Sequence, residues 1–275
     1  NRPSPMSVAM ASAANDRHVP VAVENGGGAG ALVLVCDHAS HFIPAQYAGL
    51  GLADEDRQRH IGWDIGALEL SRQLSQRLDA PLLHTTLSRL LLDVNRQPDA
   101  HDAIVGVSED IAIPGNHALG AEERALRCDW IYRPYHAAIE TLIAQRIADA
   151  RPVGVVAVHS FTPLYRGQLR PWQIGVLSQR DRRMADAVLD GLRGDNELLV
   201  GDQVGDNQPY APTDGVYHTL ERHAEAHGLP CVMLEVRNDL IRNTPGQAAW
   251  ADRLAPLLQH AFESAIRKQG AVPQP

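Results

Sequence analysis

The sequence predicts an α/β protein in which a mostly parallel sheet lies between two layers of helices. Short runs that are apolar at every residue recur along the chain and alternate with longer amphipathic segments. Runs of the first kind are typical of strands buried on both faces, whereas an apolar period near 3.6 residues indicates a helix with one buried side. Strands and helices that alternate in this way build a sheet covered on both faces. We therefore expect a three-layer α/β/α sandwich with a mostly parallel mixed sheet.

The expected elements follow one another along nearly the whole chain. The expected strands are 31–36, 81–85, 153–158, 172–177 and 231–236, and the expected helices are 64–78, 122–150, 181–192, 216–227 and 247–268. Pro134 should kink or divide the second helix, because proline lacks the amide hydrogen that a helix interior uses. Two polar segments, 97–119 and 201–215, have the composition of long functional loops.

The organisation indicates one domain after a short tail. Residues 1–21 are rich in Ala, Ser, Pro and Asn without a coherent apolar core, so we expect a flexible N-terminal tail and not a signal peptide. The glycine-rich segment 26–30 precedes a strand, whereas a phosphate loop follows one, so we expect a flexible approach to that strand. Because no repeat or linker divides the rest, residues 22–270 are predicted to form a single domain.

Composition excludes several classes of function. The net charge is −8 and no block of Lys and Arg is present, which argues against nucleic acid and membrane surfaces as partners. No apolar run is long enough to span a membrane. The three cysteines, Cys36, Cys128 and Cys231, are too few and too far apart for a disulfide framework or a cysteine-ligated zinc site. These features favour a cytoplasmic protein with a small-molecule substrate.

Three of the predicted strands end on residues that carry chemistry. The first leads into Asp37-His38, the third into His159-Ser160, and the last into Glu235-Val236-Arg237. Ligand sites in α/β proteins gather at the carboxyl ends of such strands. Two histidines and a glutamate at strand ends therefore predict one metal site.

A catalytic zinc ion takes three protein ligands and keeps a fourth position open, and another divalent metal is an alternative. His38 and His159 are the best candidate ligands, and Ser160 beside the second is a candidate polar partner. The third ligand stays open between Asp64 and His41, because Asp64 also suits the N-cap of the helix that it opens.

Glu235 is the candidate general base. A carboxylate at the end of a buried strand is costly unless it is paired or used, and beside a metal it could take a proton from water and deliver it to a leaving amine. The alternative is a structural ion pair with Arg89 or Arg237.

Arginines suggest an acidic substrate. Arg89 and Arg96 lie in one short segment and Arg237 lies two residues after Glu235. A guanidinium group binds a carboxylate through two parallel hydrogen bonds, so substrates with acidic groups suit these side chains. The chain has no G-x-S-x-G motif, which argues against a serine hydrolase.

Five sequence blocks together resemble the N-formylglutamate amidohydrolase family. In order they are Val35–Pro44 (VCDHASHFIP), His60–Ala67 (HIGWDIGA), Ser88–Arg96 (SRLLLDVNR), Val158–Phe161 (VHSF) and Leu234–Asp239 (LEVRND). The match runs from about residue 22 to 265. One difference is His41, which stands where relatives commonly have Asn.

The resemblance implies a phosphorylase/hydrolase-like fold and a zinc-dependent enzyme that cleaves N-formyl-L-glutamate to formate and L-glutamate, a step of histidine degradation. It implies one zinc ion held by His38, Asp64 and His159, with Glu235 as general base. Substrate-binding roles then fall to Arg89, Asn95, Arg96, Arg237 and Ser160. Two alternatives stay open: a peptidase or cell-wall amidase on the same scaffold, and a ligand-binding relative without turnover.

Overall fold

A seven-stranded mixed sheet forms the centre of the protein in the computed structural model, which describes residues 18–195 and 203–270. Its strands are β1 (Val21–Glu24), β2 (Leu32–Cys36), β3 (Leu82–Thr85), β6 (Gly154–Phe161), β9 (Ile174–Leu177), β10 (Val204–Asp206) and β11 (Cys231–Arg237), in the spatial order β1-β3-β2-β6-β11-β9-β10. The four central strands β3, β2, β6 and β11 are parallel, while β1 and β9 run antiparallel to their neighbours β3 and β11. The prediction of a mostly parallel mixed sheet is confirmed.

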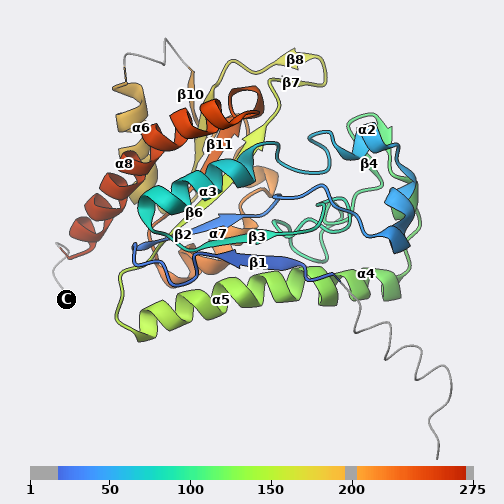
Figure 1. Cartoon of the computed structure of the whole chain (residues 1–275), viewed down its shortest axis with the longest axis horizontal. Coiled ribbons are helices and arrows are strands. Elements are labelled where there is room, and N and C mark those ends of the chain that lie inside the picture. Colours follow the sequence, from blue (N-terminus) through green and yellow to red (C-terminus); the bar gives the residue numbers. More distant parts are fainter. Residues whose placement is uncertain (1–17, 196–202, 271–275) are drawn as a thin grey trace, which may run out of the picture.

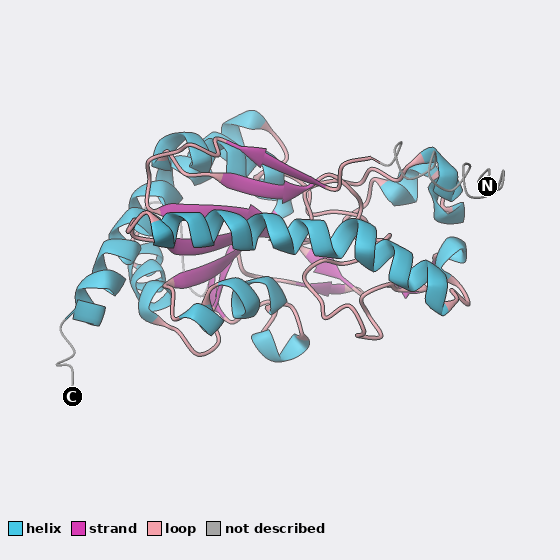
Figure 2. Ribbon diagram, turned by 90° about the horizontal axis from the view of Figure 1, so that it is seen from below, coloured by secondary structure: helices cyan, strands magenta, loops and turns pink. Residues whose placement is uncertain are grey.

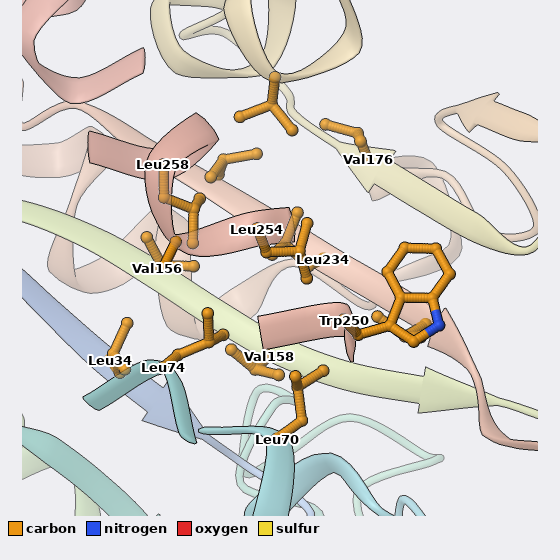
Figure 3. Close-up of a cluster of buried hydrophobic side chains, with 14 of the residues drawn as sticks. Leu34, Leu70, Leu74, Val156, Val158, Val176, Leu234, Trp250, Leu254 and Leu258 are labelled. Carbon is orange, nitrogen blue, oxygen red and sulfur yellow. The ribbon is translucent and has the colours of Figure 1, made fainter. Parts of the chain in front are cut away.

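Helices cover both faces of the sheet. One face carries α3 (Ala67–Leu78), α6 (Arg183–Arg193) and α8 (Thr244–Gly270), and the other carries α5 (Arg133–Ala148) and α7 (His218–His223), as Figure 1 shows. Side chains alternate along each buried strand, so Leu34 packs into the first layer and Val35 into the second. Figure 3 shows the first layer, where Leu34, Val156 and Leu234 meet the leucines of α3 and α8. The three-layer α/β/α architecture is confirmed.

Short elements fill the connections. They include two short helices, α2 (Asp54–Arg57) and α4 (Ala121–Arg127). Two small hairpins also stand apart from the main sheet: β4 (Val107–Ser108) pairs with β5 (Ile111–Ala112), and β7 (Leu164–Tyr165) pairs with β8 (Gln168–Leu169). The hairpin β7–β8 projects beyond the end of β6 in Figure 1. The segment 97–119, expected as a loop without regular elements, therefore contains one hairpin.

The long helix predicted at 122–150 is divided, as Pro134 indicated. A π-helical turn, Cys128–Tyr132, separates α4 from α5, and Pro134 stands in the first turn of α5, where no amide hydrogen bond within the helix is required. Figure 2 shows the three pieces as one long rod across the sheet. The rod is therefore wider in one turn just before the proline and then continues as α5.

The N-terminal boundary differs from the prediction. Val21, expected as the last residue of a tail, begins the edge strand β1, and His18 contacts Thr86. Residues 1–17 lie outside the described residues. The expected flexible segment 26–30 is instead held by Arg146, which donates hydrogen bonds to the carbonyls of Gly28 and Gly30, both at 2.6 Å. β1 escaped prediction because it is short and only half-buried.

The strand β6 extends further than predicted, to Phe161 instead of residue 158, whereas β11 ends one residue beyond the predicted strand 231–236. His159 and Glu235 are direct partners in the parallel register of these two strands. His159, expected directly after a strand, therefore stands inside one, beside Glu235. Their backbones are held by ladder hydrogen bonds at the carboxyl end of the sheet.

Candidate active site

Three buried side chains form a group that could hold a metal ion: His38, Asp64 and His159. His38 follows β2, Asp64 precedes α3, and His159 lies in β6. The Oδ2 atom of Asp64 is 3.3 Å from Nδ1 of His38 and 2.9 Å from Nδ1 of His159. Ligand atoms around a tetrahedral zinc ion are about 3.3 Å apart, given bonds of about 2.0–2.1 Å. The two carboxylate–imidazole distances are therefore close to the spacing that a zinc ion requires, and the three ligand atoms lie within 4.8 Å of one another.

The local backbone turns Asp64 toward the histidines. Its amide donates to the carbonyl of His38 at 2.9 Å, which joins the two ends of the group. The helix α3 begins only at Ala67, after Gly66, so Asp64 is not the N-cap of that helix. Gly66 has φ of +80°, and a Cβ there would stand 2.2 Å from the carbonyl oxygen of Ile241. Only glycine fits this approach, and the turn leaves the Asp64 carboxylate free to face the cluster.

Two further carboxylates hold the outer nitrogens of the histidines. Nε2 of His38 lies 2.7 Å from Oδ1 of Asp93, and Nε2 of His159 lies 3.0 Å from Oδ2 of Asp37. Asp37 also accepts hydrogen bonds from Tyr135 at 2.7 Å and Thr219 at 2.9 Å. Carboxylates in this position orient metal-binding imidazoles and make them more basic.

The charges in the cluster favour a cation. Although burial opposes the charged form, the neighbouring imidazoles hold the pKa of Asp64 well below its usual range. Burial likewise opposes protonation of His159, yet Asp37 and Asp64 raise its pKa well above the usual value. Each imidazole faces a carboxylate at both nitrogens, whereas a neutral imidazole has only one N–H group. A proton or a metal ion must therefore occupy the space between the two Nδ1 atoms and Asp64, and the donor set fits zinc.

Glu235 stands beside this cluster with one oxygen unused. Its side chain is buried, and Oε2 has no hydrogen-bond partner among the described residues. Burial raises the pKa of Glu235 to about 7, with Asp64 acting in the same direction. A buried carboxylate of that pKa exchanges protons near neutral pH, as a general acid or base must.

The cluster opens into a cavity of about 400 Å³. Residues from both expected loops line it, including Ser108 and Glu109 from 97–119 and Tyr210 from 201–215; residues 201 and 202 lie outside the described residues. Among the predicted site residues, His38, Asp64, Arg89, Asn95, Arg96, His159, Ser160 and Glu235 all contribute to its wall. Residues from three separate strand ends therefore line one cavity.

The model of the N-formylglutamate amidohydrolase family matches residues 30–242. The chain belongs to this family. A comparison with curated proteins found no match. Membership in this family supports amidohydrolase activity.

Among the described residues no helix is long and apolar enough to cross a membrane.

Two solved structures are similar to the chain over most of its length. A gene product of Agrobacterium tumefaciens is 44% identical, with a TM-score of 0.86 over 90% of this chain and 96% of its own. An N-formylglutamate amidohydrolase from Ralstonia eutropha is 21% identical, with a TM-score of 0.65 over 91% of this chain and 100% of its own. The second likeness shows a shared fold.

In this amidohydrolase most predicted polar residues also have structural partners. Arg89 pairs with Asp93 and approaches Asp64, its Nη1 lying 3.6 Å from Oδ1. Arg96 pairs with Asp102 at 2.8 Å. These two arginines are therefore part of the wall as well as candidates for substrate contact.

Asn95 and Ser160 are held by the backbone. The Asn95 side chain bridges to α7 through the carbonyl of Val216 and, at 2.9 Å, the amide of Thr219. Ser160 donates to the carbonyl of Ile65 at 2.9 Å, and its amide points to Asp64 at 3.3 Å. The backbone of Ser160 thus contacts Asp64, a candidate metal ligand, while its hydroxyl bonds the carbonyl of Ile65.

Two predicted candidates lie elsewhere. Arg237 is outside the cavity wall and pairs with Asp239 at 2.8 Å, because the backbone turns into a short 3₁₀ helix directly after β11. His41 lies against Trp63, with ring centroids 4.8 Å apart, in a separate cavity, and is absent from the metal-binding group. The geometry favours Asp64 over His41 as third ligand. It also leaves Glu235 without the proposed ion pair to Arg237.

The site also contains residues that sequence reasoning missed. Both aspartates lie inside recognised motifs, since Asp37 directly precedes His38 and Asp93 lies four residues after Arg89. For Asp37 the signal was an acidic residue next to a ligand candidate. Tyr210 and Arg166 gave no such signal, because they come from loops whose paths depend on the rest of the fold.

Proposed function

We propose that the protein is a zinc-dependent amidohydrolase that cleaves N-formyl-L-glutamate to formate and L-glutamate. The observation that carries the proposal is the unpartnered oxygen of Glu235 beside the His38, Asp64 and His159 group. Family membership supports the amide as the bond that is cleaved. The guanidinium groups in the cavity wall favour a substrate with carboxylates.

The metal would be held by Nδ1 of His38, Nδ1 of His159 and Oδ2 of Asp64, with the imidazoles oriented by Asp93 and Asp37. A bound zinc ion would act as a Lewis acid that polarises the formyl carbonyl and acidifies a water molecule. Because the cluster is buried and its side chains are held by hydrogen bonds, little reorganisation is needed when substrate enters.

Glu235 moves the protons. Its Oε2 atom accepts a proton from the water that attacks the formyl carbon, which forms the new C–O bond. When the C–N bond breaks, the same carboxyl group delivers that proton to the leaving nitrogen. Burial raises the pKa of Glu235, which favours uptake of the proton from water before its release to the leaving nitrogen.

The remaining residues orient the substrate. Arg89 lies nearest the cluster, where the α-carboxylate of an N-acyl amino acid must come close to the scissile nitrogen. Arg96, Asn95 and Ser160 offer further polar groups from the wall.

Since Cys36, Cys128 and Cys231 are free thiols, we infer a cytoplasmic location.

Metal analysis combined with a formate-release assay tests this function. We expect about one zinc ion per chain and formate release from N-formyl-L-glutamate, lost on chelation and restored by zinc. If the purified protein bound no metal and left N-formylglutamate and other N-acyl amino acids intact, the proposal would be wrong. Cleavage of muropeptides instead would indicate a cell-wall amidase.

A further inference from the structure

The hairpin β7–β8 carries an arginine in an unusual backbone conformation. The hairpin follows β6, the strand of His159, and its two-residue turn consists of Arg166 and Gly167. Their φ angles are +48° and +77°, as a type I′ turn requires. Glycine, asparagine and aspartate are the residues that usually occupy such positions, because other side chains meet steric strain there. Glycine, asparagine or aspartate at position 166 would therefore form this turn with less strain than Arg166 does.

Arg166 belongs to the wall of the catalytic cavity and has no acidic partner in the described part of the chain. Its side chain is exposed, and its guanidinium lies 5.3 Å from the ring centre of Tyr165, its neighbour in the chain. A guanidinium group presents five N–H donors in a planar fork. Those donors remain available to a ligand that enters the cavity.

The other two guanidinium groups of the cavity are already neutralised. Arg89 pairs with Asp93 and approaches Asp64. Arg96 pairs with Asp102 and donates to the carbonyl of Gly215 at 2.8 Å. An anionic group of the substrate must compete with these carboxylates at Arg89 and Arg96 but not at Arg166.

Aromatic packing holds the base of the hairpin against the cavity. The guanidinium of Arg170 lies 4.5 Å from the ring centre of Tyr165 and 4.7 Å from that of Tyr210, and it donates to the Tyr210 hydroxyl at 3.0 Å. Both tyrosines line the cavity. Tyr165 precedes Arg166 directly, so this contact holds the hairpin tip beside the cavity.

We propose that Arg166 binds the side-chain carboxylate of the substrate and selects acidic over neutral N-acyl amino acids. The inference rests on the proposed function for the reaction. In N-formylglutamate the α-carboxylate is one carbon from the scissile nitrogen, whereas the γ-carboxylate is the group farthest from it. Arg89, which approaches the buried metal-binding group, is assigned to the first carboxylate, and Arg166, at the exposed hairpin tip, is assigned to the second.

Kinetics with a matched pair of substrates test the proposal. The variants are Arg166→Gln and Arg166→Lys in the zinc-loaded protein, and the substrates are N-formylglutamate and N-formylglutamine, which differ in the side-chain charge. We expect Arg166→Gln to lower kcat/KM for the acid about 10- to 100-fold, mainly through KM, because a charge-assisted pair is lost. For N-formylglutamine, kcat/KM should change less than about threefold. Arg166→Lys should retain part of the preference for the acidic substrate.

Arg133→Gln serves as the control. Arg133 is an exposed arginine of α5 that pairs with Asp129 outside the cavity wall, so its loss should leave both substrates unaffected. If Arg166→Gln lowered kcat/KM equally for acid and amide, or for neither, the proposal would be overturned.

A binding measurement separates this proposal from the reaction itself. Isothermal titration of the zinc-loaded protein with glutarate should show binding that weakens about tenfold or more in Arg166→Gln and not in Arg133→Gln. Should the wild type release no formate while glutarate binding still depends on Arg166, the carboxylate site stands and the reaction is wrong. If glutarate did not bind the wild type, or bound the wild type and Arg166→Gln equally well, the carboxylate site would be refuted.

Discussion

Each histidine of the cluster is fixed through both of its ring nitrogens. His159 faces Asp64 with Nδ1 and Asp37 with Nε2, and His38 is held in the same way by Asp64 and Asp93. Because the outer carboxylate sets the ring orientation, the inner nitrogen points to one place. The metal-binding geometry is thus carried by residues that would not touch the metal.

The role of Glu235 leads to the first prediction. Glu235→Gln keeps the shape of the side chain but cannot accept a proton, so formate release should fall at least about 100-fold while the zinc content stays unchanged. Metal analysis and kcat on the same preparations check this. A near-normal rate in Glu235→Gln would place the general base elsewhere.

Removal of an outer carboxylate should weaken the metal site. In Asp37→Asn the acceptor charge beside Nε2 of His159 is lost, and we expect zinc affinity to fall about 10- to 100-fold. Competition with a chelator measures the zinc affinity of the variant and of the wild type. The control is Asp239→Asn, because Asp239 pairs only with Arg237 among the described residues and lies outside the cavity. Equal zinc affinity in Asp37→Asn and the wild type would contradict the assigned role.

At the level of elements, the start of α3 decides where Asp64 points. The chain passes from Asp64 through Ile65 and Gly66 into the helix, and Gly66 packs against the backbone at Ile241. A helix beginning at residue 64, as the sequence suggested, would have used the carboxylate as a cap. The late start instead gives that carboxylate to the cluster.

Gly66→Ala should therefore disturb both stability and metal binding. A left-handed φ alone costs a residue with Cβ about 1 to 2 kcal/mol, and the contact with the Ile241 carbonyl adds to it. Gly228→Ala is the matched control, because Gly228 has φ of +66° and a Cβ there would meet no described atom within 4 Å. Urea unfolding should show a larger loss for Gly66→Ala, accompanied by weaker zinc binding. Similar losses in both variants would show that the close approach at Gly66 is unimportant.

At the level of the whole molecule, a buried histidine pair joins α5 to α7 across one layer. Nε2 of His136 donates to the carbonyl of Val94 at 2.9 Å, which leaves its Nδ1 to accept from Nε2 of His223 at 2.7 Å. Burial lowers the pKa of His136 to about 4 and that of His223 to about 3. Both rings are therefore neutral in the native protein near pH 7.

This pair should make the protein less stable in mild acid. Since the unfolded histidines bind protons below about pH 6.5 and the folded ones do not, stability is lost as pH falls from 6.5 toward 4. His223→Gln removes one titrating group and keeps an amide donor for His136. Between pH 6.5 and 4 the wild type should lose at least about 1 kcal/mol more than His223→Gln in urea unfolding. Parallel pH profiles for the two proteins would contradict this.

The limits of sequence-based prediction follow from particular residues. The buried strands and the amphipathic helices were predictable from the apolar pattern, and two members of the candidate metal-binding group, His38 and His159, are indicated by the apolar runs that precede them. The edge strand β1 was not predictable, since its pattern is short and half-buried. The outward position of Arg237 was not predictable, because strand periodicity does not show that Asp239, in the 3₁₀ helix that follows β11, pairs with its guanidinium.

The sequence by itself determined the layered α/β architecture and the chemistry of the cluster, since burial period and residue type are local properties of the chain. Only the tertiary structure decided between Asp64 and His41, because Gly66 and Ile241 are far apart in sequence and together set the direction of one carboxylate. It also brought Arg166 from a separate hairpin to the cavity that holds Glu235. Such choices depend on which distant backbones pack together, and no local pattern encodes them.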